Sequence, residues 1–385
     1  MTWLIISYGA YVIGQNTQRI YAIYQNQIVD SFTTGTRPVP NHFIISNDTF
    51  IVVNSGGFSG DGSIAFIRNN NIIYELLLPS HMNPMQIVKV NNKLYFTDFG
   101  NTFNNKVYII QNYNIVDSIT VSKRPDGIAY CFGYIFVAST GINSDYSYDD
   151  TSSVHRINPS NNNTTRIRVR SNAKSIKCDN NFVYVMTAGT YVNWQPQNNS
   201  TIYKIEPISF TIIDSTRNLE NVFEFAVGNN YIFAGVWKFD SVKVYKINKN
   251  DFNQIDSFKL NFGGFGGVDY DGEYFKFSLG GFTGGSNAIY VLRESDNFSY
   301  YYTHHNNDVG SGYIKAIIGN PVSIQERYVV KDGVIYFSKE EFIEVYEVSG
   351  RKILQTKANR LNINSLGTGI YIIKYSNGAL RVFAP

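Results

Sequence analysis

The sequence predicts an all-β protein whose larger part is a seven-bladed β-propeller, and three observations lead to this prediction. Six tight turns, each joining a short apolar strand to an aromatic-rich strand, recur at spacings of 44, 41, 48, 49 and 42 residues. Each unit between them contains four strand patterns, and such a period is typical of propeller blades. The first and last segments of the repeat also supply the strands of one further blade between them. The turns are Asn47-Asp48, Asn91-Asn92, Phe132-Gly133, Asn180-Asn181, Asn229-Asn230 and Asp271-Gly272.

Six units are complete, and each follows the order strand, tight turn, strand, long loop, strand, turn, strand. The second blade is predicted at His42–Ser46, Phe50–Asn54, Ser63–Arg68 and Ile72–Leu78. The third is predicted at Gln86–Val90, Leu94–Asp98, Lys106–Gln111 and Ile115–Val121, and the fourth at Gly127–Cys131, Tyr134–Ser139, Ser153–Asn158 and Thr165–Val169. The remaining three span Ser175–Arg217, Phe223–Leu260 and Gly266–Thr303.

The first blade is predicted to close the ring with strands from both ends of the repeat. Trp3–Ser7, Arg19–Tyr24 and Ile28–Phe32 supply its second, third and fourth strands, and Tyr313–Ile318 supplies the first. Closure of this kind leaves no exposed sheet edge. It also favours a strand over a signal peptide for the apolar start of the chain, which lacks a basic leading region.

The propeller part resembles the YVTN-type repeats of microbial surface proteins. The resemblance rests on the run from Asp117 to Ala129, which contains Arg124-Pro125-Asp126-Gly127-Ile128-Ala129, followed by Tyr134-Ile-Phe-Val-Ala-Ser139. It covers roughly residues 2–320 and implies a fold rather than a particular activity. We therefore expect a propeller domain over residues 1–320.

Residues 321–385 are expected to form a small β-sandwich of seven short strands. These are Tyr328–Val330, Val334–Ser338, Ile343–Val348, Lys352–Thr356, Leu361–Ile363, Gly369–Tyr375 and Leu380–Phe383, with turns such as Ser349-Gly350. The stretches from Ile343 to Ile353 and from Leu366 to Lys374 resemble the C-terminal sorting domain of type IX secretion. That family directs export and anchors its cargo at the outer surface. A docking module in another setting, including a virus particle, is the alternative.

Composition limits the class of function. A net charge of +3 is too small for a nucleic-acid footprint, and no stretch of 18 apolar residues predicts a membrane span. The two cysteines, Cys131 and Cys178, lie in the first strands of successive blades. Aligning Ile128 with Ile176 places their side chains on opposite faces, so we expect two free, buried cysteines rather than a disulfide.

The candidate binding surface is the face that carries the long loops, because alternate turns of an up-and-down sheet emerge on the same side. Aromatic residues on polar, glycine-rich loops are suited to stacking on sugar rings or anchoring a protein partner. Trp194, in the longest of these loops, is the best single candidate; the alternative is that such rings fold back over the blade ends. The candidate ligand-binding residues are Phe58, Tyr146, Tyr148, Tyr191, Trp194, Trp237, Phe239 and Phe282, and Phe103 lies in a loop of the same kind.

Catalytic and metal-binding residues are not apparent, and no cofactor is expected. Asp145, Asp149 and Asp150 share a loop without a cation-binding pattern, and the five histidines are scattered. The channel-lining positions of the first strands are expected to be mostly apolar, with Lys174, Lys177 and Glu224 as exceptions. A propeller hydrolase needs carboxylates, histidines or a nucleophile that converge on the channel.

The sequence therefore favours a non-catalytic recognition or adhesion protein on a cell or virion surface, extracellular and not membrane-spanning. It would bind a surface glycan or a protein through the loop face, with the C-terminal domain as a tether. A coat or filament subunit and a metal-dependent hydrolase or lactonase at the channel are the alternatives. Asn-x-Ser/Thr sequences are too frequent in so asparagine-rich a chain to indicate glycosylation.

Overall fold

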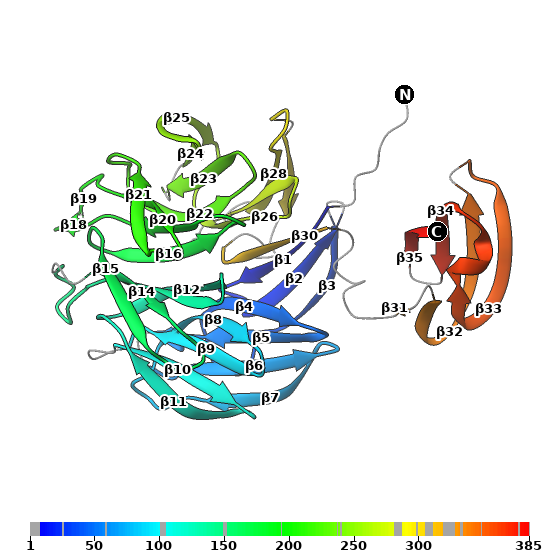
Figure 1. Cartoon of the computed structure of the whole chain (residues 1–385), viewed down its shortest axis with the longest axis horizontal. Helices are drawn as coiled ribbons and strands as arrows, with labels where there is room; N and C mark the ends of the chain where they lie inside the picture. Colours follow the sequence, from blue (N-terminus) through cyan, green and yellow to red (C-terminus); the bar gives the residue numbers. More distant parts are fainter. Residues whose placement is uncertain are drawn as a thin grey trace. The chain divides into compact units, whose positions relative to one another are not determined.

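The computed structural model describes residues 8–24, 27–57, 60–100, 105–148, 152–193, 195–236, 238, 241–280, 287–297, 299–304, 311–318, 328–331, 334–347, 349–375 and 378–384. The chain divides into two compact units, residues 1–318 and 319–385. In the described part of the first unit, the strands form seven four-stranded antiparallel sheets, plus one two-stranded ribbon (Figure 1). This is the predicted seven-bladed propeller.

Blades 2 to 4 follow one another along the chain. Blade 2 contains β4 (Pro40–Ser46), β5 (Thr49–Asn54), β6 (Ser63–Arg68) and β7 (Asn71–Leu77). Blade 3 contains β8 (Pro84–Val90), β9 (Lys93–Asp98), β10 (Lys106–Gln111) and β11 (Asn114–Thr120). Blade 4 contains β12 (Pro125–Cys131), β13 (Tyr134–Ser139), β14 (Ser153–Ile157) and β15 (Thr164–Arg168).

Blades 5 to 7 repeat the pattern. Blade 5 contains β16 (Ala173–Cys178), β17 (Val183–Thr187), β20 (Thr201–Glu206) and β21 (Thr211–Ser215), with the ribbon β18 (Tyr191–Val192) and β19 (Gln195–Pro196) between its second and third strands. Blade 6 contains β22 (Val222–Val227), β23 (Tyr231–Val236), β24 (Val242–Asn248) and β25 (Asp251–Leu260). Blade 7 contains β26 (Phe265–Tyr270), β27 (Tyr274–Leu279), β28 (Asn287–Arg293) and β29 (Ser299–His304). All six predicted turns join the first strand of a blade to the second.

Burial follows the position of a strand in its blade. The second strands β5, β17 and β27 are buried at every residue, because both of their faces pack against neighbouring blades. The fourth strand β21 is exposed at four of its five residues. First strands of successive blades contact one another near the middle of the ring, whereas fourth strands such as β7, β11 and β25 lie outside (Figure 1). The apolar core is therefore divided into layers between blades.

Blade 1 closes the ring as predicted, although a different segment supplies its second strand. β30 (Ile314–Ile318) pairs antiparallel with β1 (Tyr8–Gly14), which continues to β2 (Arg19–Tyr24) and β3 (Gln27–Thr33). The prediction of Trp3–Ser7 for the second strand was wrong, and residues 1–7 lie outside the described part. Both segments are apolar, but only β1 is separated from β2 by a four-residue turn that sets the register.

A buried lysine joins blade 7 to the closing blade. Lys276 of β27 donates from Nζ to the carbonyl oxygens of Gly9 (2.7 Å) and Ile317 (2.8 Å), one on each of the paired strands β1 and β30. It also forms an ion pair of 2.6 Å with Asp271, and both side chains are nearly inaccessible. Burial lowers the pKa of Lys276, while Asp271 works to raise it. The charged ammonium group of Lys276 can be buried because its N–H groups have hydrogen-bond acceptors.

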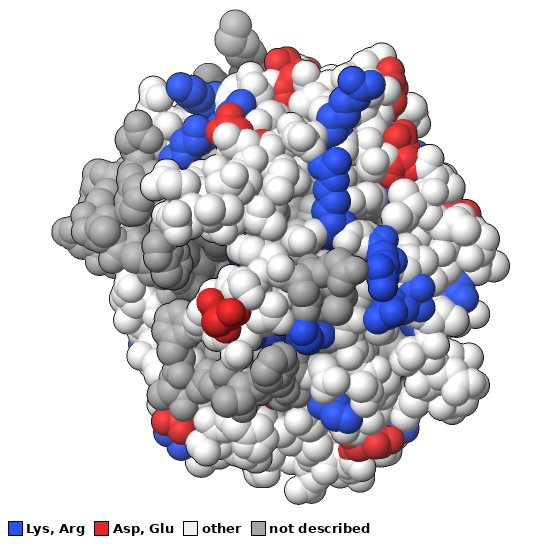
Figure 2. Space-filling view, turned by 90° about the vertical axis from the view of Figure 1, so that its left-hand side faces the viewer, with Lys and Arg blue, Asp and Glu red and all other residues white. Residues whose placement is uncertain are grey.

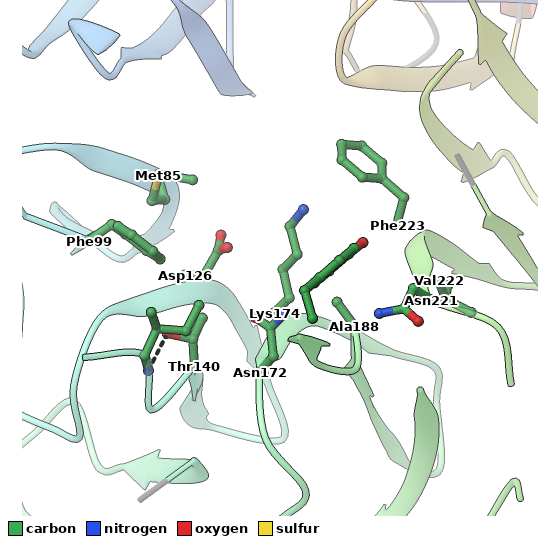
Figure 3. Close-up of a pocket in the computed structure, with 12 residues that line it drawn as sticks. Met85, Phe99, Asp126, Thr140, Asn172, Lys174, Ala188, Asn221, Val222 and Phe223 are labelled. Carbon is green, nitrogen blue, oxygen red and sulfur yellow. Dashed lines mark hydrogen bonds between the residues drawn. The ribbon is translucent and has the colours of Figure 1, made fainter. Parts of the chain in front are cut away.

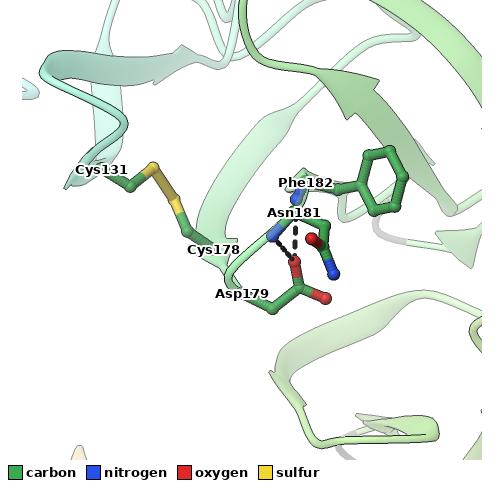
Figure 4. Close-up of a disulfide and its surroundings, with 5 residues drawn as sticks. All are labelled: Cys131, Cys178, Asp179, Asn181 and Phe182. Carbon is green, nitrogen blue, oxygen red and sulfur yellow. Dashed lines mark hydrogen bonds between the residues drawn. A yellow bond between two sulfur atoms is a disulfide. The ribbon is translucent and has the colours of Figure 1, made fainter.

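The structure contradicts the prediction of two free cysteines, because Cys131 and Cys178 form a disulfide with a Cα–Cα distance of 6.6 Å (Figure 4). The two side chains do leave opposite faces of equivalent strands. Ile128 packs in the layer between blades 3 and 4, whereas Cys131 and Cys178 both pack in the layer between blades 4 and 5. When two successive blades pack, the rear face of one contacts the front face of the next. Side chains on opposite faces of equivalent strands, such as Cys131 and Cys178, can therefore meet in the layer between the blades.

The turn that follows Cys178 is braced by the carboxylate of Asp179. It accepts hydrogen bonds from the Asn181 and Phe182 N–H groups, both at 2.8 Å (Figure 4), and pairs with Lys249 of blade 6 at 2.6 Å. Burial works to raise the pKa of Asp179, but the hydrogen bonds from Lys249 and the two N–H groups outweigh it and hold the pKa below its usual value. The disulfide and this carboxylate thus tie blades 4, 5 and 6 together at the tight-turn side.

The described part of the second unit contains one five-stranded sheet and a short 3-10 helix. Its elements are β31 (Tyr328–Lys331), β32 (Val334–Glu347), β33 (Lys352–Asn362), η3 (Ile363–Leu366), β34 (Gly369–Tyr375) and β35 (Gly378–Ala384). The prediction of seven strands was wrong, because two pairs of predicted strands are continuous in β32 and β33. The register between these strands breaks between Tyr336 and Glu341. Ile335 and Leu361 before the break share one core with Ile343, Val345 and Ile373 after it, so the hairpin folds over on itself as a small sandwich.

Candidate functional site

The candidate site lies on the loop face, which we define as the side where second-to-third and fourth-to-first strand connections emerge. Figure 2 shows the side on which β18 and β19 lie in Figure 1, and most of the described surface there is uncharged. Of the eight predicted ligand-binding residues, Tyr146, Tyr148 and Tyr191 lie in the described part. Phe58, Trp194, Trp237, Phe239 and Phe282 lie outside the described residues, as do Phe103, Asp149 and Asp150.

The three described tyrosines come together although they belong to two blades. Tyr146 and Tyr148 come from the loop after β13, Tyr191 comes from the loop after β17, and all three line a hollow of about 390 Å³ with Ile142, Asp145 and Asn193. Tyr146 and Tyr191 are 55% and 44% exposed, so their rings are available to a ligand. We call this hollow the outer pocket.

Both loops are held by hydrogen bonds within the described residues. In the first, Asn143 N–H donates to the Ser147 carbonyl (2.9 Å), and Asp145 accepts from the Ser147 N–H (3.0 Å) and hydroxyl (2.6 Å). These bonds hold the pKa of Asp145 below its usual value. Asp145, the described member of the predicted acidic cluster, therefore braces its own loop.

The loop that carries Tyr191 is fixed by two asparagines from neighbouring connections and by one of its own. Asn172 donates from Nδ2 to the Gly189 carbonyl (2.9 Å), and Asn221 donates from Nδ2 to the Thr190 carbonyl (3.2 Å). Asn199 accepts from the Thr190 N–H at 2.8 Å. A loop held at several points loses less entropy when a ligand binds.

A second and deeper cavity adjoins the outer pocket. It has a volume of about 510 Å³ and shares Ile142 and Tyr191 with the outer pocket. Figure 3 shows side chains from blades 3 to 6 around this space, which we call the inner cavity. Its other lining residues are Met85, Phe99, Asp126, Thr140, Asn172, Lys174, Ala188, Asn221, Val222 and Phe223.

Two charged side chains, Asp126 and Lys174, extend into the inner cavity from β12 and β16 (Figure 3). Asp126 is 4% exposed, and no described residue donates a hydrogen bond to its carboxylate. Burial raises the pKa of Asp126 to about 7; nearby Lys174 lowers it and Glu224 adds to the rise. The Lys174 ammonium lies 4.0 Å from the centre of the Phe223 ring and, among described residues, has no hydrogen-bond acceptor.

Close approach of the two strands positions this pair. A Cβ on Gly127 would lie 2.6 Å from the Lys174 carbonyl oxygen and 2.9 Å from the Ser175 Cα, so only glycine allows the contact.

Arg124 precedes Asp126 by two residues in the sequence. Its guanidinium stacks between the rings of Phe99 and Tyr146, at 4.9 and 5.0 Å, and thereby joins the inner cavity to the outer pocket.

The channel beyond the inner cavity is more polar than predicted. Besides Lys177 and Glu224, which form an ion pair of 3.7 Å, Lys315 pairs with Asp269 at 2.8 Å. The rings of His42 and Tyr313 lie 4.5 Å apart. Burial, with Lys177 and Lys315 as smaller contributions, lowers the pKa of His42 to about 3. The prediction of a mostly apolar channel was therefore wrong.

A β-bulge explains why Asp126 was missed. The register between first and second strands shifts near the start of β4, β8, β12, β16, β22 and β26. Such a bulge breaks the period-two alternation on which the prediction relied. In blade 4 the shift lies between Pro125 and Ile128 and spans Asp126, within the very motif that carries the propeller resemblance.

Metal-binding clusters are not found in the described part of the chain, where no three His, Cys, Asp or Glu side chains are placed to hold an ion. Within the same residues no helix is long and apolar enough to span a membrane.

Comparison with known proteins supports both parts of the architecture. Residues 331–383 match the family described as the secretion system C-terminal sorting domain. The chain carries this domain as a tail, which indicates secretion and a surface or extracellular location. A search of curated proteins found no match.

The solved structures that resemble the chain support the propeller fold. Hydrazine synthase from Kuenenia stuttgartiensis is 14% identical, with a TM-score of 0.57, covering 74% of this chain and 92% of that one. A protein of unknown function from Desulfotomaculum acetoxidans is 12% identical, with a TM-score of 0.57, covering 81% and 99%. A candidate 6-phosphogluconolactonase from Bacteroides uniformis is 9% identical, with a TM-score of 0.58, covering 81% and 99%. At these identities the likeness concerns the fold alone, and it identifies no catalytic family.

Proposed function

We propose that this protein is a non-catalytic recognition protein of the cell surface, which binds a glycan through the outer pocket and the inner cavity. The observation that carries the proposal is the convergence of Tyr146, Tyr148 and Tyr191 on the mouth of a cavity lined by further aromatic rings. Exposed tyrosine rings stack on the C–H faces of sugars and keep their hydroxyl groups for hydrogen bonds. The sorting tail favours a cellular surface over a virus particle as the setting.

The test is binding of glycans to the full chain and to a variant that carries Tyr146→Ala and Tyr191→Ala. A glycan array identifies ligands, and calorimetry measures their affinity. We expect at least a tenfold loss of affinity in the variant, because stacking on both rings is lost. Tyr130→Ala is the matched control, since Tyr130 is 43% exposed but lies on β12 beside the tight turn. Equal affinity in all three proteins would contradict the proposal.

The two tryptophans predicted for the loop face provide an independent test. Trp194→Ala and Trp237→Ala are each expected to weaken glycan binding without lowering the melting temperature. If neither substitution changes the affinity, the role proposed for the loop aromatics other than tyrosine is wrong.

The tail is proposed to act as the tether. In a host that has the matching secretion system, the full chain is expected at the cell surface, and a variant that lacks residues 319–385 is expected inside the cell. Mass spectrometry of surface and interior fractions measures this. A surface location for both forms would contradict the role of the tail.

One observation favours a hydrolase as the second candidate. A buried carboxyl with a pKa near neutrality in a cavity is suited to general acid–base catalysis, and Asp126 has this property. A hydrolase would release sugars or open lactones in a manner abolished by Asp126→Asn, with ligand binding retained. Turnover of a bound glycan by the purified protein would replace the non-catalytic proposal.

A further inference from the structure

We infer that the inner cavity selects an acidic sugar, a ring that carries both a carboxylate and hydroxyl groups, at the end or branch of the bound glycan. The inference rests on the proposed function and names the class of ligand. It depends on one donor side chain and one acceptor side chain that share the cavity without bonding to each other.

The donor is Lys174. Its ammonium has three N–H groups and lies 4.0 Å from the centre of the Phe223 ring, and no described residue accepts a hydrogen bond from it. The aromatic ring attracts the cation and excludes water from one side of it. A carboxylate that enters the cavity would accept from these N–H groups in a charge-assisted hydrogen bond.

The acceptor is Asp126. Its carboxyl is 4% exposed and lines the cavity, yet no described residue donates to it. A carboxyl that lines a cavity and has no protein donor is available to a ligand hydroxyl. Because burial raises the pKa of this carboxyl toward neutrality, the group can either accept from a hydroxyl or donate to one.

The balance of charge around the cavity favours an anion. Lys174 lies in its wall. The Arg124 guanidinium stacks on Phe99, which also lines the cavity, and its Nη1 atom is buried and has no hydrogen-bond partner among the described residues. Glu224, which does not line the cavity, pairs with Lys177 and accepts from the Ser175 hydroxyl at 2.7 Å. Lys174 and Asp126 are the two charged residues among those that line the inner cavity. Because burial raises the pKa of Asp126 to about 7, its carboxyl offsets the ammonium only in part at neutral pH.

The apolar lining accounts for the sugar ring. Met85, Phe99, Ala188, Val222 and Phe223 provide surfaces for C–H groups, and Tyr191 continues from the inner cavity to the outer pocket. The next sugar of a chain would then lie against Tyr146. A peptide carboxylate would also reach Lys174, but it would leave Asp126 without a hydroxyl partner.

The experiment compares acidic oligosaccharides with their methyl esters by calorimetry on the full chain. The probes are oligomers of galacturonate, glucuronate and mannuronate, each paired with its ester, which keeps the ring and removes the charge. The proteins are the wild type, Lys174→Met, Lys174→Arg and Asp126→Asn. Lys89→Met is the control, because Lys89 lies near the other end of a first strand and bonds to Ser46.

At least one acid is expected to bind the wild type at least tenfold more tightly than its ester. Lys174→Met should abolish this difference, Lys174→Arg should restore much of it, and Lys89→Met should leave it unchanged. Asp126→Asn should weaken acid and ester alike, because the amide is a different partner for the hydroxyl. Melting temperatures show whether each variant folds.

Two outcomes would overturn the inference alone. One is binding of neutral glycans, or of esters as tightly as acids, that still depends on Tyr146 and Tyr191. The other is tighter binding of a polyglutamate peptide than of every uronate. If no glycan of either kind binds, the proposed function fails together with the inference.

Discussion

At the scale of single residues, the most informative groups are buried side chains that titrate between pH 3 and 8. Asp126 and His155 are both at least nine-tenths inaccessible, and in both cases burial is the main cause of the shift. Burial acts on them in opposite directions, because it disfavours the charged form of each. The carboxyl keeps its proton to higher pH, and the imidazole releases its proton at lower pH.

Asp126→Asn is expected to stabilise the protein at alkaline pH. The folded-state pKa is about 7, against 3.8 for an ordinary aspartate, so the folded state binds more protons between these values and loses stability as pH rises through them. Wild type should therefore lose roughly 2–4 kcal/mol relative to the variant between pH 4.5 and pH 8. Urea unfolding of both proteins at the two pH values measures the difference. An equal pH dependence would show that the carboxyl is solvated.

His155→Gln is expected to reduce the loss of stability in acid. The Nε2 atom of His155 accepts from the Ser122 N–H at 2.9 Å, so the neutral ring carries its proton on Nδ1. A second proton, on Nε2, would break this hydrogen bond, because two N–H donors would then face each other. Burial, with a smaller contribution from Arg166, lowers the pKa to about 4, so stability falls as pH drops from about 6.5 toward 4. At pH 5 the loss from this group is roughly 2 kcal/mol.

The control for this substitution is unfolding at pH 7.5, where His155 is neutral in both states and glutamine can still accept from Ser122. A glutamine variant whose stability falls with acid as steeply as that of the wild type would assign the effect to other groups. His42, with a pKa lowered to about 3, would be the next to examine.

At the scale of the element, the bulge near the start of the first strands determines what lines the channel. Where a shift occurs, two successive residues can both face inward. Lys174 lines the inner cavity, and the hydroxyl of the next residue, Ser175, donates to Glu224. Sequence alternation predicted most of the strands, but the first strand predicted for blade 4 began at Gly127, so Asp126 was left outside it. A bulge leaves little trace in composition, although Gly127 and the proline before Asp126 are compatible with one.

Lys276→Met is expected to loosen the closing blade more than any exposed substitution. It removes the donor to Gly9 and Ile317 and leaves the carboxylate of Asp271 buried without its cation. We expect a loss of roughly 3–5 kcal/mol, typical of breaking one partner of a buried pair. Denaturant unfolding measures the loss, with Lys259→Met as the exposed control. Recovery of stability in Lys276→Met with Asp271→Asn would confirm that the stranded charge is the cause.

At the scale of the whole molecule, the disulfide is the covalent link between two blades. It joins residues 47 apart, so it restricts a long segment of the unfolded chain. Replacing Cys131 and Cys178 together by serine is expected to cost roughly 2–4 kcal/mol. Thermal unfolding with and without a reductant measures this, and the reductant should affect only the wild type. A reductant effect on the double variant would point to a cause other than this bond.

Much of the fold could be predicted because the repeat is strongly periodic. The tight turns were found since Asn and Gly adopt the backbone angles that such turns require, as Asn47, Asn91 and Gly133 do here. Ring closure was predicted from the missing strand, but Trp3–Ser7 and Tyr8–Gly14 are both apolar, and composition could not choose between them. The disulfide was missed because side chains on opposite faces of two successive blades were expected to point apart, whereas these are the two faces that pack against each other.

The candidate site was only partly predictable. Exposed loop aromatics such as Tyr146 and Tyr191 can be recognised from composition and loop length. Asp126 could not be recognised, because its burial depends on blades 3 and 4 closing over it and on the bulge that turns it inward. The sorting tail was predictable, because its motifs are local in sequence.

Closure of the ring by β30 determines how a mechanical load would enter the molecule. If the tail is fixed to a cell and the loop face holds a ligand, tension along the chain reaches the propeller at Ile318, the end of a first strand at the middle of the disc rather than of a strand at its rim. The chain cannot unravel blade by blade from that point until the hydrogen bonds of β30 with β1 rupture. Under shear flow on such a surface, the pairing of β30 with β1 would therefore be the first part of the propeller to resist the force.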